Sequence, residues 1–97
     1  MKSLEEIQQL LQTHRDLLQD RFRVSEMSIF GSYARGQQTP SSDLDLLIDY
    51  DQPPTLWMLA QLRDYLSEML EMRVDVVTQK GLKHRIRERV LGEAVKV

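Results

Sequence analysis

The chain has 97 residues, no cysteine, and 13 basic against 15 acidic side chains, which gives a formal net charge of −2. The lack of cysteine excludes a disulfide framework and thiolate metal sites, and the near balance of charge excludes bulk attraction to DNA or to an anionic membrane. We expect one domain over residues 1–97, without a membrane segment, in the cytoplasm.

The first half of the chain predicts a helix followed by two strands. Ser3 and Glu6 have the spacing of a capping box, and apolar residues recur at helical spacing as far as Leu18, so we expect one helix there. Residues 24–30 alternate loosely and predict a half-buried strand. Residues 43–50 alternate strictly, with apolar side chains at the even positions and aspartates at three of the odd ones, which predicts a second strand.

The second half predicts a helix, a strand and a further helix. Two prolines and Thr55 end the second strand and begin a helix with an apolar stripe from Leu59 to Met69. Residues 73–77 are short and β-branched, as in a strand. From Leu82 the apolar residues recur at helical spacing, and we expect a last helix that runs almost to Val97. The fold class is therefore α/β, with a small mixed sheet of about three strands backed by helices.

Between the first two strands lies the segment Gly31-Ser32-Tyr33-Ala34-Arg35-Gly36, which has the character of a phosphate-binding turn. Glycine at position 31 lets the backbone approach a phosphate closely, and Ser32 can donate both its N–H and its hydroxyl. Arg35 adds positive charge. The segment matches neither the P-loop nor the dinucleotide fingerprint, because the required glycine and lysine spacings are absent.

Three aspartates predict a metal site next to this turn. Asp43 and Asp45 are two residues apart on a strand, so their carboxylates share a face, about 7 Å apart along the backbone. Asp75 lies in another strand and joins them if the two strands are neighbours. Because close carboxylates repel one another, hard divalent cations are the expected occupants, and two Mg²⁺ ions could orient a nucleoside triphosphate. Asp75 would also assist deprotonation of an attacking hydroxyl.

Gly31-Ser32, Asp43-x-Asp45 and Asp75 together resemble the polymerase-β-like nucleotidyltransferase superfamily, and the pattern from Gly31 to Leu46 is similar to the minimal nucleotidyltransferases, or MNT proteins. The resemblance implies Mg²⁺-dependent transfer of AMP from ATP. It further implies an antitoxin that modifies a tyrosine of a HEPN-domain toxin within a hetero-oligomer. Gly31 and Ser32 would contact phosphate with Arg35 beside them, and all three aspartates would be catalytic metal ligands.

Other readings of the sequence stay open. A Gly-Ser turn and a Ser-Asp turn are common in proteins without a nucleotide site, and the basic run from Lys80 to Arg89 is more often a solvated helix face than a binding surface. The chain could be a non-catalytic antitoxin that inhibits its partner by binding. A third possibility is transfer to RNA or to a small molecule with a companion subunit. The acceptor, the number of AMP units and the oligomeric state are not determined by the sequence.

Overall fold

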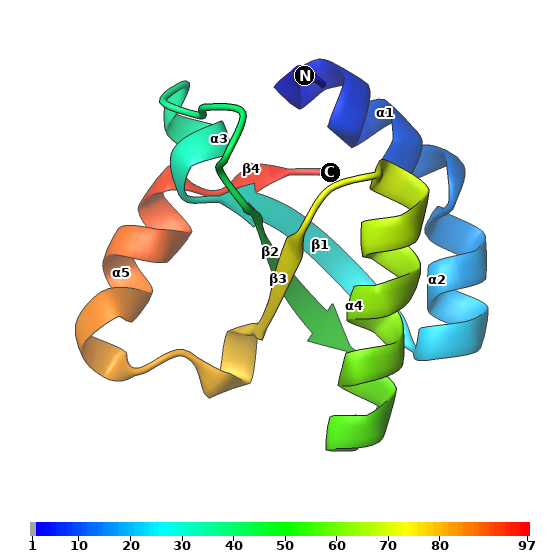
Figure 1. Ribbon diagram of the computed structural model, residues 1–97. Coiled ribbons are helices and arrows are strands. Elements are labelled where there is room, and N and C mark those ends of the chain that lie inside the picture. The colour runs from blue at the N-terminus through cyan, green and yellow to red at the C-terminus, as the bar shows by residue number, and fades with distance from the viewer. Residues whose placement is uncertain (1) are drawn as a thin grey trace.

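The computed structural model describes residues 2–97, which form a sheet of four strands with helices on both faces (Figure 1). Among these residues no helix is both long and apolar enough to span a bilayer. In chain order the elements are α1 (Leu4–Thr13), α2 (Arg15–Phe22), β1 (Val24–Phe30), α3 (Ser32–Arg35), β2 (Leu44–Tyr50), α4 (Leu56–Leu70), β3 (Val74–Thr78), the 3₁₀ turn η1 (Gln79–Gly81), α5 (His84–Glu93) and β4 (Val95–Lys96).

The sheet is mixed, as predicted, with the strand order β3-β2-β1-β4. β1 is antiparallel to both of its neighbours, and β2 is parallel to β3 through the crossover helix α4. The fourth strand corrects the expected number of three. The last helix ends at Glu93, and Val95 and Lys96 pair with Ile29 and Ser28 instead of continuing the helix. Pairing with β4 satisfies main-chain groups of β1 that would otherwise form an open edge.

The predicted first helix is divided in two at His14. Its start is as expected, because the Ser3 hydroxyl accepts the N–H of Glu6 and the Glu6 carboxylate accepts the N–H of Ser3. At His14 the backbone leaves the helical region (φ −100°, ψ 8°), and the ring Nδ1 lies 2.8 Å from the Leu10 carbonyl oxygen. The apolar stripe continues through α2, so the break changes the direction of the chain without changing which residues are buried.

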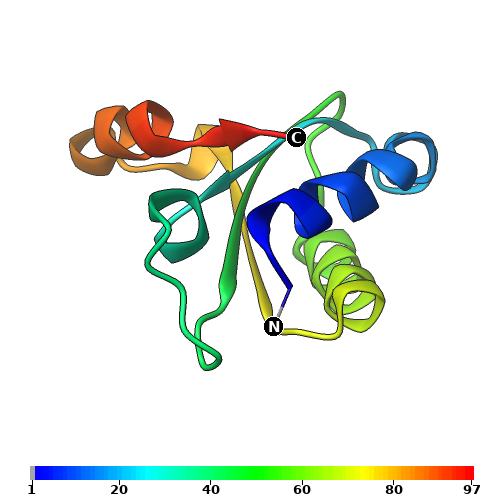
Figure 2. The ribbon, with the colours of Figure 1, turned by 90° about the horizontal axis from the view of Figure 1, so that it is seen from above.

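The main core lies on one face of the sheet, beneath α1, α2 and α4. Figure 2 shows α1 and α4 on one side of the strands and α5 on the other. Leu44, Leu46 and Ile48 of β2 point into this core, and the residues between them point to the opposite face. Helix α4 begins with the Thr55 hydroxyl accepting the N–H of Met58. The strict alternation of β2 thus brings its aspartates to the face that the main core does not occupy.

Candidate active site

The phosphate-binding turn predicted at Gly31 joins β1 directly to the short helix α3. Gly31 has φ 74° and ψ −150°, a backbone conformation that is essentially restricted to glycine. A Cβ atom at this position would overlap the Oδ2 of Asp45. Glycine is therefore needed twice, for its backbone conformation and for the close approach of the Asp45 carboxylate. Ser32 begins α3, so the expected helical turn after the glycine is present.

Asp45 and Asp75 lie side by side across the parallel pair of β2 and β3, whose register aligns the two residues. From the sequence, Asp75 was expected to join Asp45 if the strands that carry them were neighbours. The two strands are neighbours in the sheet. Both side chains alternate with residues of the main core, so both belong to the opposite face. This register brings two of the three predicted carboxylates together next to Gly31.

The surroundings of Asp45 oppose its ionisation. Burial contributes most to raising the pKa of this carboxyl above its ordinary value, and the negative charges of Asp75 and Asp43 raise it further. The positive charge of Arg35 acts in the opposite sense but does not cancel them. A carboxylate held in this way gains from a nearby cation, and its oxygen ligands are those that Mg²⁺ prefers.

Asp43 is held in an ion pair outside the Asp45–Asp75 pair. It lies just before β2, and its Oδ1 is 3.1 Å from the Nε of Arg73 in an exposed ion pair. Within residues 2–97, no three histidine, aspartate or glutamate side chains converge as a ready-made metal site. The structure therefore assembles Asp45 and Asp75, while Asp43 is nearby but paired with Arg73. As a donor set the three fit a hard divalent cation once Asp43 leaves this ion pair.

Glu93, at the end of α5, is a site residue that the sequence did not reveal. Its Oε1 accepts the N–H of Gly31 at 3.2 Å, and its two carboxylate oxygens accept from Arg35 Nη1 at 3.2 and 3.1 Å. Partial burial alone would raise the pKa of Glu93, but the bonds from Arg35 and Gly31, with the charges of Arg35 and Arg89, lower it. Glu93 thus holds two of the three predicted phosphate-binding residues, Gly31 and Arg35, while it is ionised.

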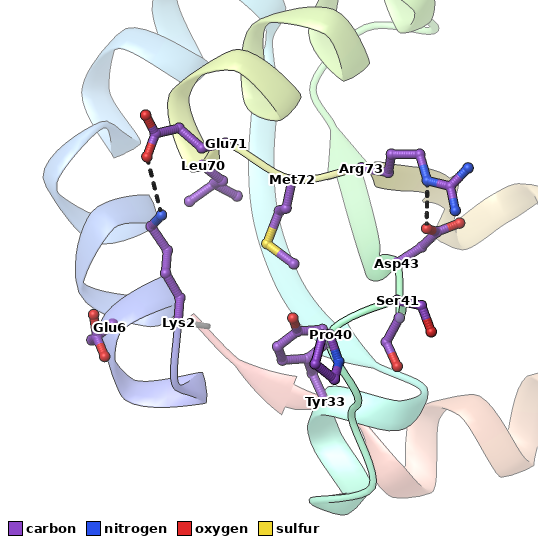
Figure 3. Close-up of a pocket in the computed structure, with 11 residues that line it drawn as sticks. Lys2, Glu6, Tyr33, Pro40, Ser41, Asp43, Leu70, Glu71, Met72 and Arg73 are labelled. Carbon is purple, nitrogen blue, oxygen red and sulfur yellow. Dashed lines mark ion pairs between the residues drawn. The ribbon is translucent and has the colours of Figure 1, made fainter.

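A cavity of about 740 Å³ opens beside Asp43, between the start of α1, the loop after α3 and the end of α4. Figure 3 shows Tyr33 and Met72 facing the same hollow, with the Asp43–Arg73 ion pair at one side and the Lys2–Glu71 ion pair, at 3.6 Å, at the other. Cavities of this size accommodate small-molecule ligands. This cavity could not be predicted from the sequence, because its walls come from separate segments of the chain.

The nucleotidyltransferase domain family matches residues 11–97. The chain belongs to this family. The protein adenylyltransferase MntA of Thermococcus cleftensis is 42% identical over 97 residues, which cover 100% of this chain and 98% of that protein. The prediction that the chain is a nucleotidyltransferase is thereby confirmed.

Solved structures agree with this assignment of the nucleotidyltransferase. A structure provisionally named a minimal nucleotidyltransferase superposes with a TM-score of 0.83 at 36% identity, covering 99% of this chain and 97% of the other. A more distant one is described as a tri-AMPylated Shewanella oneidensis HEPN toxin in complex with MNT antitoxin. It has a TM-score of 0.69 at 19% identity and covers 93% of this chain and 70% of that chain, so the likeness concerns the fold.

The basic run of this nucleotidyltransferase does not join the site as a whole. The basic side chains from Lys80 to Arg89 are exposed, and Lys80 Nζ lies 5.3 Å from the centre of the Tyr50 ring. Only Val90 of α5 is buried among the described residues of that helix. The run is thus a solvated surface in this structure. Arg89 is near enough to Glu93 for its positive charge to help lower the pKa of that carboxyl.

Proposed function

We propose that this nucleotidyltransferase transfers AMP from ATP to a tyrosine hydroxyl of a HEPN-type toxin and acts in the cytoplasm as its antitoxin. The alignment of Asp45 with Asp75, directly beside the Gly31 turn, is the observation that carries the proposal. The relationship to MntA supports a protein acceptor. The structural likeness to an MNT antitoxin bound to a HEPN toxin supports the type of partner.

The residues of the site divide the reaction between them. The Gly31 turn, Ser32 and Arg35 hold the triphosphate, with Arg35 exchanging its Glu93 partner for phosphate oxygen. The tyrosine oxygen attacks the α-phosphorus of ATP, the bond to the β-phosphate breaks, and pyrophosphate leaves with the electron pair. Asp75, exposed at the edge of the sheet, accepts the hydroxyl proton.

Asp45, Asp75 and Asp43 would hold two Mg²⁺ ions, by analogy with other two-metal sites. When bound, Mg²⁺ neutralises charge on the phosphates and on the departing pyrophosphate. The raised pKa of Asp45 supports this assignment, since a cation relieves the repulsion and burial that cause it. Asp43 would have to leave Arg73 in order to join the other two carboxylates.

The test is the intact mass of a HEPN-type toxin after incubation with this chain, ATP and Mg²⁺. Asp45→Asn should abolish any gain of AMP, whereas Asp49→Asn, on the same face of β2 four residues further on, should leave it unchanged. Omission of Mg²⁺ should also abolish the gain. A toxin that gains no mass yet stays inhibited would favour the non-catalytic antitoxin. AMP found on RNA or on a small molecule would favour transfer to those acceptors with a companion subunit.

A further inference from the structure

The outer edge of β3 carries main-chain groups without a strand partner. β3 is the terminal strand of the sheet, and its only neighbour among residues 2–97 is β2. The N–H of Leu44 donates to the Arg73 carbonyl at 2.9 Å, so the parallel pattern turns the main-chain groups of Arg73 and Asp75 towards β2. Those of Val74 and Val76 therefore point outward, where an added strand could pair with them.

A groove runs between this edge and helix α4. It has a volume of about 220 Å³ and is lined by Leu56, Leu59, Ala60, Arg63, Asp75 and Val76. Figure 1 shows α4 lying alongside β3. Leu56 is 86% exposed and the adjacent Trp57 is 73% exposed, although both are large apolar side chains. A strand edge beside an apolar helix surface is an arrangement that binds extended peptides by strand addition.

We propose that the acceptor protein presents its tyrosine on an extended segment that adds to the sheet along β3. The inference rests on the proposed function, because Asp75 is both a wall of the groove and the acceptor-side carboxylate of the site. A second copy of this chain is a poorer occupant. Symmetric pairing of two β3 edges would bring two Asp75 carboxylates close together, and like charges across strands destabilise pairing.

The register of such a strand defines a sequence preference. A residue opposite Asp75 places its side chain on the face that carries Asp45 and Asp75, about 5 Å from Asp75 between Cβ atoms. Its two neighbours point to the other face, towards α4, where they meet Leu56 and Leu59. The preferred acceptor is thus a tyrosine with an apolar residue on each side.

Two nine-residue peptides of identical composition test this preference. One has valine on each side of a central tyrosine, and the other has glycine there and its valines at the ends. With ATP and Mg²⁺, mass spectrometry should show AMP on the first peptide at a rate about tenfold higher. Leu56→Glu should lower this rate about tenfold through KM with kcat unchanged, and Leu17→Glu, an exposed leucine on α2, should not.

Amide hydrogen exchange gives a second readout of strand addition that does not depend on AMP transfer. In the Asp45→Asn chain, the first peptide should slow exchange at Val74 and Val76 and the second should not. Protection without AMP on any acceptor would overturn the proposed function and leave strand addition standing. AMP on both peptides at equal rates without protection would overturn strand addition alone. The absence of both AMP and protection would overturn both.

Discussion

On the face of the sheet covered by α1, α2 and α4, Ile7, Leu46 and Leu66 are completely buried, whereas on the opposite face the same strands present Asp45 and Asp75. Alternation along β2 separates the two sets by a single residue. The first face supplies the hydrophobic stabilisation, and the second holds partly exposed carboxylates that oppose it. Removing a core side chain should therefore lower stability, whereas removing the charge of Asp45 should raise stability and abolish activity.

The largest effect on stability is expected in the core. Leu66→Ala removes a fully buried side chain of α4 and should lower the free energy of unfolding by about 2–5 kcal/mol in urea denaturation. Leu91→Ala is the control, since Leu91 is 42% exposed on α5 and should cost about 0.5 kcal/mol or less. Equal losses in the two variants would contradict the assignment of the main core to one face.

Gly31→Ala tests the turn on the opposite face. The new Cβ would overlap the Asp45 carboxylate in a backbone conformation that alanine rarely adopts, so unfolding should become easier by roughly 1–3 kcal/mol. AMP transfer should fall with it. Gly92→Ala is the matched control, because the added Cβ meets nothing within 4 Å beyond its chain neighbours and the local helix backbone, and alanine favours a helix. A Gly31→Ala chain as stable as the Gly92→Ala chain would show that the turn tolerates a side chain.

Asp45→Asn should abolish transfer and yet stabilise the chain in the absence of metal. Because burial and the charges of Asp75 and Asp43 raise the pKa of Asp45, its ionised form is a cost to the fold at neutral pH. The expected gain is on the order of 0.5 kcal/mol in thermal unfolding without metal. Mg²⁺ should raise the Tm of the unsubstituted chain and leave the variant nearly unchanged. A variant stabilised by Mg²⁺ to the same extent would remove Asp45 from the metal ligands.

A pH-dependent effect on stability is expected at Glu93. Its pKa lies below the ordinary 4.5, so its contribution is present above that pH and is lost as the pH falls through the lowered pKa. Glu93→Gln should cost about 0.5–1 kcal/mol near neutral pH, and the difference from the unsubstituted chain should shrink as the pH falls below 4.5. Glu88→Gln, exposed on the same helix, should show no such convergence. A pH-independent difference for Glu93→Gln would assign it a packing role instead.

Local pattern predicted most of the fold. Alternation identified β1 and β2, the Thr55 cap and the apolar stripe identified α4, and β-branched residues identified β3 to within one residue. β4 could not be predicted in this way, because two residues carry no reliable period and their pairing depends on β1, far away in the chain. The apolar residues beyond Glu93 continued the helical spacing by coincidence, so the last helix was predicted too long. The break at His14 was also hidden, since the buried stripe continues across it.

In the candidate site, too, the features set by local sequence were predicted and those set by distant contacts were not. Gly31 and the pair of aspartates belong to one continuous motif, and Asp75 was identified by its position within a run of valines. The sequence could not show that Asp43 pairs with Arg73 or that Glu93 binds Gly31, because both contacts depend on the packing of distant segments. The roles of the three aspartates as metal ligands, and of Gly31, Ser32 and Arg35 in phosphate binding, stay predictions.

The bond between Gly31 and Glu93 joins residues 62 positions apart, whereas the turn itself lies between two strands that pair with each other. Contacts between close segments form early in folding, and distant ones bear the larger entropy of loop closure. We therefore expect the turn to take shape with β1 and β2 and to gain its carboxylate partner only when β4 docks. Maturation of the phosphate-binding turn would then be a late kinetic event. In stopped-flow refolding, Glu93→Gln should therefore leave the early phase unchanged.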